Sequence, residues 1–117
     1  MVGVRLVWSA DATPLRPYKV FLRLLAADGR LVAQRDGEPA GGSRPTTGWA
    51  TGEIVVDNHG LLLPDDLVPG EYALWLGLYD AFDAATRLPV GGSDSLLLGL
   101  ITVQPVSYTH LTLPTTI

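Results

Sequence analysis

Cysteine is absent from this 117-residue chain. Neither a disulfide nor a thiolate metal site can form, and the redox compartment stays open, since a β-sandwich outside the cell can do without a disulfide. Histidine is almost absent too, with His59 and His110 as its two positions. An imidazole-rich metal site cannot be assembled from so few ligands. We therefore expect no metal and no cofactor.

Basic residues and long apolar segments are also scarce. Eight lysines and arginines stand against twelve acidic residues, which gives a formal net charge of -4, and the basic residues are scattered along the chain. Because nucleic-acid binding normally needs a basic face, we expect no nucleic-acid partner. The longest apolar runs are far shorter than the ~20 residues that span a bilayer. The sequence therefore predicts no direct membrane insertion.

Helical periodicity is missing, and short alternating segments bounded by turns take its place. Thirteen glycines and nine prolines mark the turns. Strands are predicted over residues 2–8, 19–26, 31–35, 53–63, 71–80, 87–90 and 96–103, with a bulge at 58–60 and a turn at 81–86. Residues 36–51 are predicted to be irregular. The sequence thus predicts an all-β fold, an antiparallel immunoglobulin-like β-sandwich of about seven strands.

The segment before Tyr72 predicts how the central strand begins. Leu67, Pro69 and Gly70 form a turn signal directly ahead of this tyrosine. A tyrosine near the start of a strand can return its hydroxyl to the backbone a few residues upstream, which is the tyrosine corner of β-sandwiches. Since strand side chains alternate, we expect the even positions 72–78 and Trp8 to face the core. We expect the odd positions of the central strand, and Phe21 of the second strand, to face outward.

The sequences at the two ends of the chain predict where the native domain begins and ends. Residues 1–5 lead straight into strand alternation with no signal peptide, which predicts a domain truncated at its start. Residues 106–115 read Val-Ser-Tyr-Thr-His-Leu-Thr-Leu-Pro-Thr, and they resemble one translated frame of a common transposase sequencing adapter. We predict a β-sandwich domain over residues 1–105 and a non-native, adapter-like tail over residues 106–117, in which His110 has no functional meaning. A native, threonine-rich final strand is the alternative.

A family resemblance rests on a series of short segments in this strand order. They are YKVFLRL at 18–24, DGRLVAQRD at 28–36, PTTGW at 45–49, GEIVVD at 52–57, LPDDL at 63–67, PGEY at 69–72, GLYD at 77–80 and RLPV at 87–90. With these segments, residues 4–103 resemble the carboxyl-terminal β-sandwich module of bacterial membrane glycosyltransferases of the mannosyltransferase and aminoarabinose-transferase type. Trp75 departs from the pattern, because a polar residue is expected there.

The resemblance implies a function for the module rather than a reaction. Enzymes of this type use lipid-linked sugars, and their catalytic acids lie in a multi-pass membrane part that has no counterpart here, so no catalytic residue carries over. The implied role is that of a non-catalytic accessory domain on the extracytoplasmic face of a bacterial membrane, either periplasmic or at the cell surface. It would pack on the membrane domain of its own parent chain or present glycan or acceptor to it. The alternative is a free-standing cell-surface interaction or carbohydrate-binding β-sandwich.

Three aromatic residues are the candidate carbohydrate-binding residues. Trp75 and Tyr79 are expected on one face of the central strand, where a solvated pair would form a flat platform for a sugar ring. The alternative is that this face is covered, or that Trp75 packs against a neighbouring domain. Trp49 stands in a loop rich in glycine and proline, and it is either a third binding aromatic or, as we favour, a plug that closes the end of the sandwich.

Calcium binding and catalysis are further alternatives with weaker support. Calcium takes several carboxylate and carbonyl ligands, but the aspartates near the turns do not show the spacing of a calcium loop. These aspartates are Asp36, Asp57, Asp80, Asp83 and Asp94. Asp28, Asp80 and Asp83 are better explained as turn formers that bind local backbone. Glu53 and Asp57 are predicted on one side of a strand, where they would form an acid/base pair, with His59 as a base. The same pattern of residues is expected on a solvated strand face that has no catalytic role.

Overall fold

The computed structural model describes residues 1–90, 92–103 and 109–116, and within them the chain forms eight strands and two short 3-10 turns. The strands are β1 (Val2–Ser9), β2 (Tyr18–Leu25), β3 (Leu31–Gly37), β4 (Val55–Leu61), β5 (Gly70–Asp80), β6 (Asp83–Leu88), β7 (Leu96–Val103) and β8 (Thr109–Thr116). The turns are η1 (Pro39–Gly42) and η2 (Thr46–Gly48). No helix of this described part is long and apolar enough to cross a membrane.

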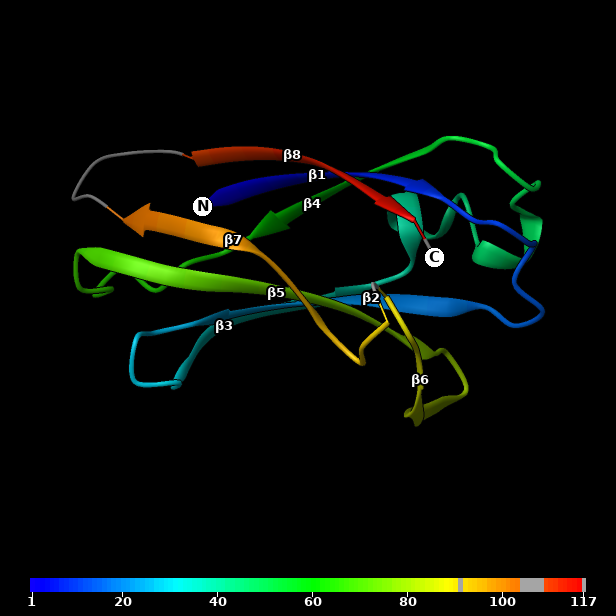
Figure 1. Ribbon diagram of the computed structural model, residues 1–117. Helices are drawn as coiled ribbons and strands as arrows, with labels where there is room; N and C mark the ends of the chain where they lie inside the picture. The colour runs from blue at the N-terminus through cyan, green and yellow to red at the C-terminus, as the bar shows by residue number, and fades with distance from the viewer. Residues whose placement is uncertain (91, 104–108, 117) are drawn as a thin grey trace.

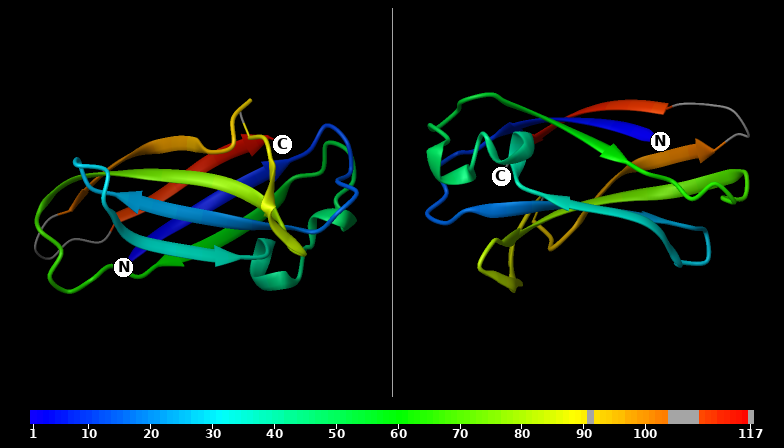
Figure 2. Two further views of the ribbon diagram at one scale, coloured as in Figure 1. Left: turned by 90° about the horizontal axis from the view of Figure 1, so that it is seen from below. Right: turned by 180° about the vertical axis from the view of Figure 1, so that it is seen from behind.

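The strands form two sheets that face each other as two layers (Figure 1). One sheet has the order β4-β1-β8, and the other has the order β3-β2-β5-β6, with β7 also paired to β5. The strands of the two layers cross at an angle when the molecule is seen from below (Figure 2). The predicted all-β sandwich is confirmed, with eight strands in place of about seven. One pairing departs from the antiparallel prediction, since β8 runs parallel to β1.

The core lies between the two layers and is built by strand alternation. Trp8 and the even positions of β1 are buried, as are alternate residues of β2 and β5. Their side chains belong to one apolar cluster, whose most buried members are Leu6, Trp8, Val20, Leu22, Leu24, Leu61, Leu74, Leu76 and Leu78. The predicted inward face of the central strand is therefore confirmed. Burying this apolar surface is the main stabilising contribution in such a domain.

The tyrosine corner forms as predicted. The Tyr72 hydroxyl donates a hydrogen bond of 2.5 Å to the carbonyl oxygen of Val68, which lies in the turn before β5. The ring itself is buried in the core cluster. The corner thus attaches the turn between β4 and β5 to the start of the central strand.

The predicted bulge at residues 58–60 is wrong. β4 is continuous from Val55 to Leu61 and pairs residue by residue with β1, with no shift of register. Its burial alternates regularly, so that Asp57 and His59 point inward between buried apolar neighbours. The sequence pattern looked interrupted because polar residues occupy inward positions, and these residues are buried with hydrogen-bond partners.

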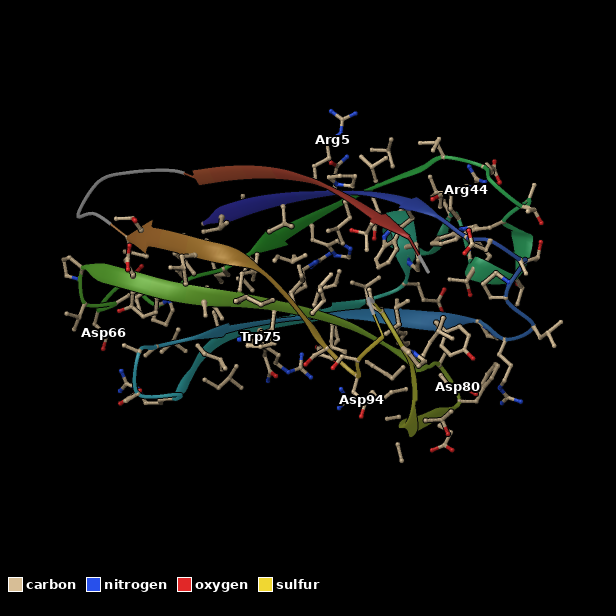
Figure 3. The ribbon with its side chains drawn as sticks, in the orientation of Figure 1. Arg5, Arg44, Asp66, Trp75, Asp80 and Asp94 are labelled. Atoms are coloured by element: carbon tan, nitrogen blue, oxygen red, sulfur yellow. The ribbon has the colours of Figure 1, made fainter. Side chains whose placement is uncertain are left out.

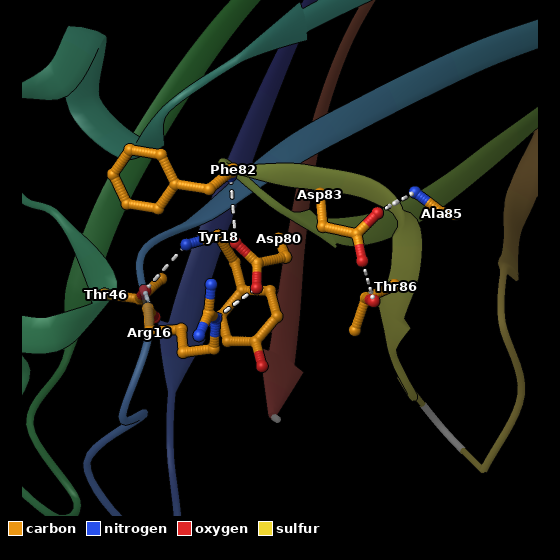
Figure 4. Close-up of polar contacts among 8 residues, drawn as sticks. All are labelled: Arg16, Tyr18, Thr46, Asp80, Phe82, Asp83, Ala85 and Thr86. Carbon is orange, nitrogen blue, oxygen red and sulfur yellow. Dashed lines mark hydrogen bonds and ion pairs between the residues drawn. The ribbon is translucent and has the colours of Figure 1, made fainter.

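The predicted turn at 81–86 is too long, since β6 begins at Asp83. Asp80 Oδ1 accepts a hydrogen bond of 2.9 Å from the backbone N–H of Phe82, and its other oxygen forms an ion pair with Arg16 (Figure 4). The Asp83 carboxylate accepts from the backbone N–H of Ala85. Asp28 likewise accepts from a backbone N–H two residues further on. The expectation that these aspartates are turn formers is confirmed.

Both β6 and β7 pair with the same edge of β5. β7 pairs with Gly70–Leu76 and β6 pairs with Leu78–Asp80, so the two strands share the length of the central strand. A bulge in the β5–β7 ladder lies between Leu74 and Trp75. The outward side chains of β5 therefore have neighbouring strands on both sides, β2 on one and β6 and β7 on the other.

The predicted domain boundary at residue 105 lies outside the described residues. Within the tail, Thr109–Thr116 forms β8, which pairs with β1 from Val2 to Ser9 along the edge of the smaller sheet (Figure 1). Pro114 stands opposite Val7 in this ladder, and a proline has no N–H to donate to it. The adapter-like origin of the tail stays a prediction.

Candidate functional site

The candidate site lies on the outer face of the five-stranded sheet, which we define as the face turned away from β1, β4 and β8. The β2–β5 register places Arg23 opposite Trp75, Phe21 opposite Gly77 and Lys19 opposite Tyr79. Directly opposed residues of an antiparallel pair point to the same side of the sheet. Trp75 accordingly projects from β5 away from the smaller sheet (Figure 3).

Phe21 points outward and is nevertheless only 3% exposed. The ring of Tyr79 lies beside it, with the two ring centroids 6.3 Å apart. The guanidinium groups of Arg23 and Arg87 cover the Phe21 ring, with their Cζ atoms 4.7 and 4.5 Å from its centroid. The predicted outward direction is right, but charged side chains cover the ring through cation–π contacts.

Asp36 holds two side chains of this face in place. Its Oδ1 accepts a hydrogen bond of 2.8 Å from Arg23 Nη1, and its Oδ2 accepts one of 3.0 Å from the Tyr79 hydroxyl. Burial raises the pKa of Tyr79, and the hydrogen bond to Asp36 and the charge of that carboxylate raise it further. The Tyr79 hydroxyl therefore stays protonated at neutral pH and is fixed as a donor to Asp36.

Trp75 stands beside a shallow hollow of about 350 Å³ on the outer face. The hollow is lined by Phe21, Arg23, Leu25, Trp75, Arg87 and Ser95. On the neighbouring strand β7, Leu97 is paired with Trp75 and is 46% exposed. Leu100, further along β7, is 60% exposed. The lining thus combines apolar side chains with two arginines and a serine, and exposed apolar side chains of β7 follow outside it.

The structure brings Trp75 and Tyr79 to one face, as predicted, but not as one continuous platform. Gly77 lies between them on β5, and the Phe21 ring occupies the space above it, because a Cβ atom at position 77 would lie 2.0 Å from that ring. Trp75 is half-buried and borders the hollow, while Tyr79 is held against Phe21 and Asp36. Of these two candidates, Trp75 is the one placed to contact a ligand in the hollow.

Trp49 is buried and offers no ring face to a ligand, being 1% exposed. Its indole N–H donates a hydrogen bond of 2.9 Å to the carbonyl oxygen of Arg44, and its ring lies 6.0 Å from that of Trp8. The Thr13 hydroxyl donates to the Trp49 carbonyl oxygen. Its assignment as a binding aromatic is thus corrected, and the favoured interpretation of Trp49 as a plug is what the structure shows.

The proposed pair of Glu53 and Asp57 does not form. Glu53 precedes β4, where its carboxylate accepts from the backbone N–H of Ala50 and from Arg44 Nη2. These two hydrogen bonds lower the pKa of Glu53. Asp57 is fully buried inside the sandwich instead of lying on a solvated strand face. The two carboxylates therefore cannot act as an acid and base on one substrate.

Asp57 and His59 form a buried polar network that the sequence interpretation missed. The Asp57 carboxylate accepts from Trp8 Nε1 at 3.0 Å, from the Ala40 backbone N–H at 2.8 Å and from His59 Nε2 at 2.7 Å. Arg35 Nε donates to His59 Nδ1 at 3.2 Å, which leaves His59 Nε2 to donate to Asp57. Burial alone would raise the pKa of Asp57, but these hydrogen bonds outweigh it and lower that pKa.

The network links parts of the chain that are far apart in sequence. It joins β1, β3 and β4 to η1, where Ala40 adopts a left-handed backbone conformation with φ of 52°. Every polar atom of the Asp57 and His59 side chains already has a partner. We interpret the network as a structural clamp between the two sheets rather than as catalytic machinery.

The outer face thus combines a half-buried tryptophan, two arginines and a hollow, and it is our candidate ligand surface. Phe21, Arg23 and Arg87 were not predicted as site residues, although outward alternation on β2 was a usable signal for the first two. In the described ranges 1–90, 92–103 and 109–116, His, Asp and Glu side chains do not gather into a group able to hold a metal ion. Comparisons with known proteins give no further assignment, since no protein-family model, curated protein or solved structure matches this chain.

Proposed function

We propose that this chain is a non-catalytic accessory domain of a bacterial membrane glycosyltransferase, and that its outer face holds glycan or acceptor for the enzyme. The observation that carries the proposal is the half-buried Trp75 at the edge of a hollow that also contains arginine and serine side chains. Carbohydrate sites combine an aromatic surface for stacking with a few polar groups that orient the sugar hydroxyls. The sequence resemblance supplies the membrane enzyme and the extracytoplasmic location.

Glycan binding by the intact chain tests the proposal. Wild type, Trp75→Ala and Tyr79→Ala are compared on a glycan array, and binding to the best glycans is then measured by calorimetry. Phe82→Ala is the matched control, because Phe82 is an 80% exposed aromatic residue in the turn between β5 and β6. We expect Trp75→Ala to abolish binding, Tyr79→Ala to weaken it and Phe82→Ala to leave it unchanged. If wild type binds no glycan, or if Trp75→Ala binds as well as wild type, the proposal is wrong.

Packing against the parent enzyme is a second candidate function for the same face. The exposed Leu97 and Leu100 beside Trp75 favour it, since neighbouring exposed apolar side chains mark interaction surfaces. The gene sequence upstream of Met1 separates this role from that of a free-standing cell-surface domain. A multi-pass hydrophobic region encoded there supports the accessory domain, and its absence would remove that role and leave a free-standing carbohydrate-binding or interaction sandwich.

A further inference from the structure

We propose that the hollow beside Trp75 binds an anionic sugar, one that carries a carboxylate or a phosphate group. This inference rests on the proposed function and adds the chemical class of the ligand. The sugar ring would stack on Trp75, and its anionic group would lie at the guanidinium group of Arg87. The argument depends on which polar groups border the hollow and which of them already have a partner.

Arg87 is the first of these groups. Its guanidinium group lies over the Phe21 ring, and within the described residues it forms no ion pair. A guanidinium group stacked on a ring keeps its N–H donors at its edges, in the plane, where they can bind the two oxygens of a carboxylate or phosphate. Arg87 is therefore held in position by the ring while its donors stay available.

Two further polar groups of the hollow, on Trp75 and Ser95, are donors available to a ligand. The Trp75 indole N–H has no recorded hydrogen-bond acceptor among the described residues, in contrast to the indoles of Trp8 and Trp49. Ser95 adds a hydroxyl, and the lining includes no acidic side chain. A ligand rich in acceptors would satisfy this set of donors, whereas a cationic ligand would meet the like charge of Arg87.

The Asp36 carboxylate of the outer face is already paired, although the chain as a whole has a net charge of -4. Both oxygens of Asp36 are used by Arg23 and Tyr79. The charge of Asp36 is thus paired with that of Arg23, and Arg87 is a second positive charge that lines the hollow. Asp94, which is exposed and precedes Ser95, lies outside the lining. Because the site is open to solvent, its attraction for an anion should weaken as salt is added.

The experiment compares matched sugars with and without an anionic group. Calorimetry at low ionic strength measures the binding of trigalacturonic acid, of its fully methyl-esterified counterpart, of galactose 6-phosphate and of galactose. We expect the acid to bind at least about tenfold more tightly than the ester, because charge-assisted hydrogen bonds to arginine are the stronger kind. The phosphate arm shows whether the anionic group that is recognised is a carboxylate or a phosphate.

Two arginine variants assign the effect to the hollow. Arg87→Gln should remove the preference for the acid, whereas Arg5→Gln should keep it, because Arg5 is exposed on the opposite side of the sandwich (Figure 3). Circular dichroism confirms that Arg87→Gln is folded, and Arg87→Lys should retain part of the preference because it keeps the charge.

The outcomes separate this inference from the proposed function. If the ester binds as tightly as the acid, or if Arg87→Gln keeps the preference, the anionic ligand is wrong while glycan binding stands. If neither charged sugar binds but neutral glycans do, the anionic ligand is also wrong. If no sugar of any kind binds, both proposals fail together.

Discussion

The Phe21 ring lies directly over Gly77, in the space that a side chain at position 77 would fill. A Cβ atom added to Gly77 would lie 2.0 Å from Cζ of Phe21 and 2.9 Å from the backbone oxygen of Asp94. We therefore predict that Gly77→Ala lowers the free energy of unfolding by about 1–3 kcal/mol, the usual cost of overpacking. Urea denaturation of both proteins measures the difference.

Gly99→Ala is the control for this substitution. Gly99 lies in β7, and a Cβ atom added there would meet nothing within 4 Å. We expect its free energy of unfolding to stay within about 0.5 kcal/mol of wild type. Equal losses for the two alanine variants would contradict the close approach of Phe21 to Gly77, because they would reflect a general cost of replacing strand glycines.

Tyr72→Phe removes the hydrogen bond of the tyrosine corner while keeping the ring in the core. We predict a loss of about 1 kcal/mol in the free energy of unfolding, the typical net value of one hydrogen bond. Tyr79→Phe is the comparison, since its hydroxyl bonds the exposed Asp36 and the cost there should be smaller. A Tyr72→Phe variant as stable as wild type in thermal and urea unfolding would show that the hydroxyl of Tyr72 is not holding the corner.

Strand alternation and turn chemistry made most of the fold predictable from the sequence. Tyr72 and its preceding turn indicated the corner, and Asp28 and Asp83 were recognisable because short polar side chains bind nearby backbone N–H groups. The error in β4 has a physical cause as well. Asp57 and His59 are buried polar residues, and a pattern based on hydrophobicity cannot show that Trp8 and Ala40 supply the hydrogen bonds that make their burial tolerable.

The buried network makes a prediction about pH. The folded-state pKa of Asp57 lies below its ordinary value of 3.8, so this carboxylate stabilises the fold above that pH, and the contribution is lost as the pH falls through the folded-state pKa. Asp57→Asn should lower the free energy of unfolding at neutral pH by about 1–3 kcal/mol, because it weakens several buried hydrogen bonds.

The difference between wild type and Asp57→Asn should then narrow as the solution is acidified below about pH 4. The lowered pKa values of Glu53 and Asp80 act in the same direction, but both residues are present in both proteins and cancel in the difference. Urea unfolding of both proteins over a series of pH values measures this difference in the free energy of unfolding. A difference that stays constant down to strongly acidic pH would contradict the lowered pKa of Asp57.

The tail gives a prediction about truncation. We expect a chain that lacks residues 106–117 to remain folded, because, among the side chains that the structure describes, the buried apolar core residues lie between Val2 and Ile101. The Thr115 hydroxyl is also buried with no hydrogen-bond partner among the described residues, which is unfavourable for β8. Near-ultraviolet circular dichroism and cooperative thermal unfolding are the readouts. An unfolded truncated chain would mean that the tail belongs to the native fold.

The candidate site was only partly predictable, because it depends on contacts across strands. Alternation placed Trp75 and Tyr79 on one face, but it could not show that Phe21 would fill the gap over Gly77. Nor could it show that Arg87, from a strand predicted as a short edge segment, would lie over that ring. The burial of Trp49 depends on Trp8, which is distant in sequence, so composition of the loop alone left two interpretations open.

Nuclear magnetic resonance of the three tryptophan indole N–H groups tests the central claim most directly, because each group reports a different place. Those of Trp8 and Trp49 donate to Asp57 and to the Arg44 carbonyl oxygen in the interior, and that of Trp75 borders the hollow. When a mixture of neutral and acidic oligosaccharides is added, we predict that the Trp75 resonance moves and saturates while the other two stay in place. A Trp75 resonance that does not move, at sugar concentrations up to saturation of the solution, would contradict a glycan site on the outer face.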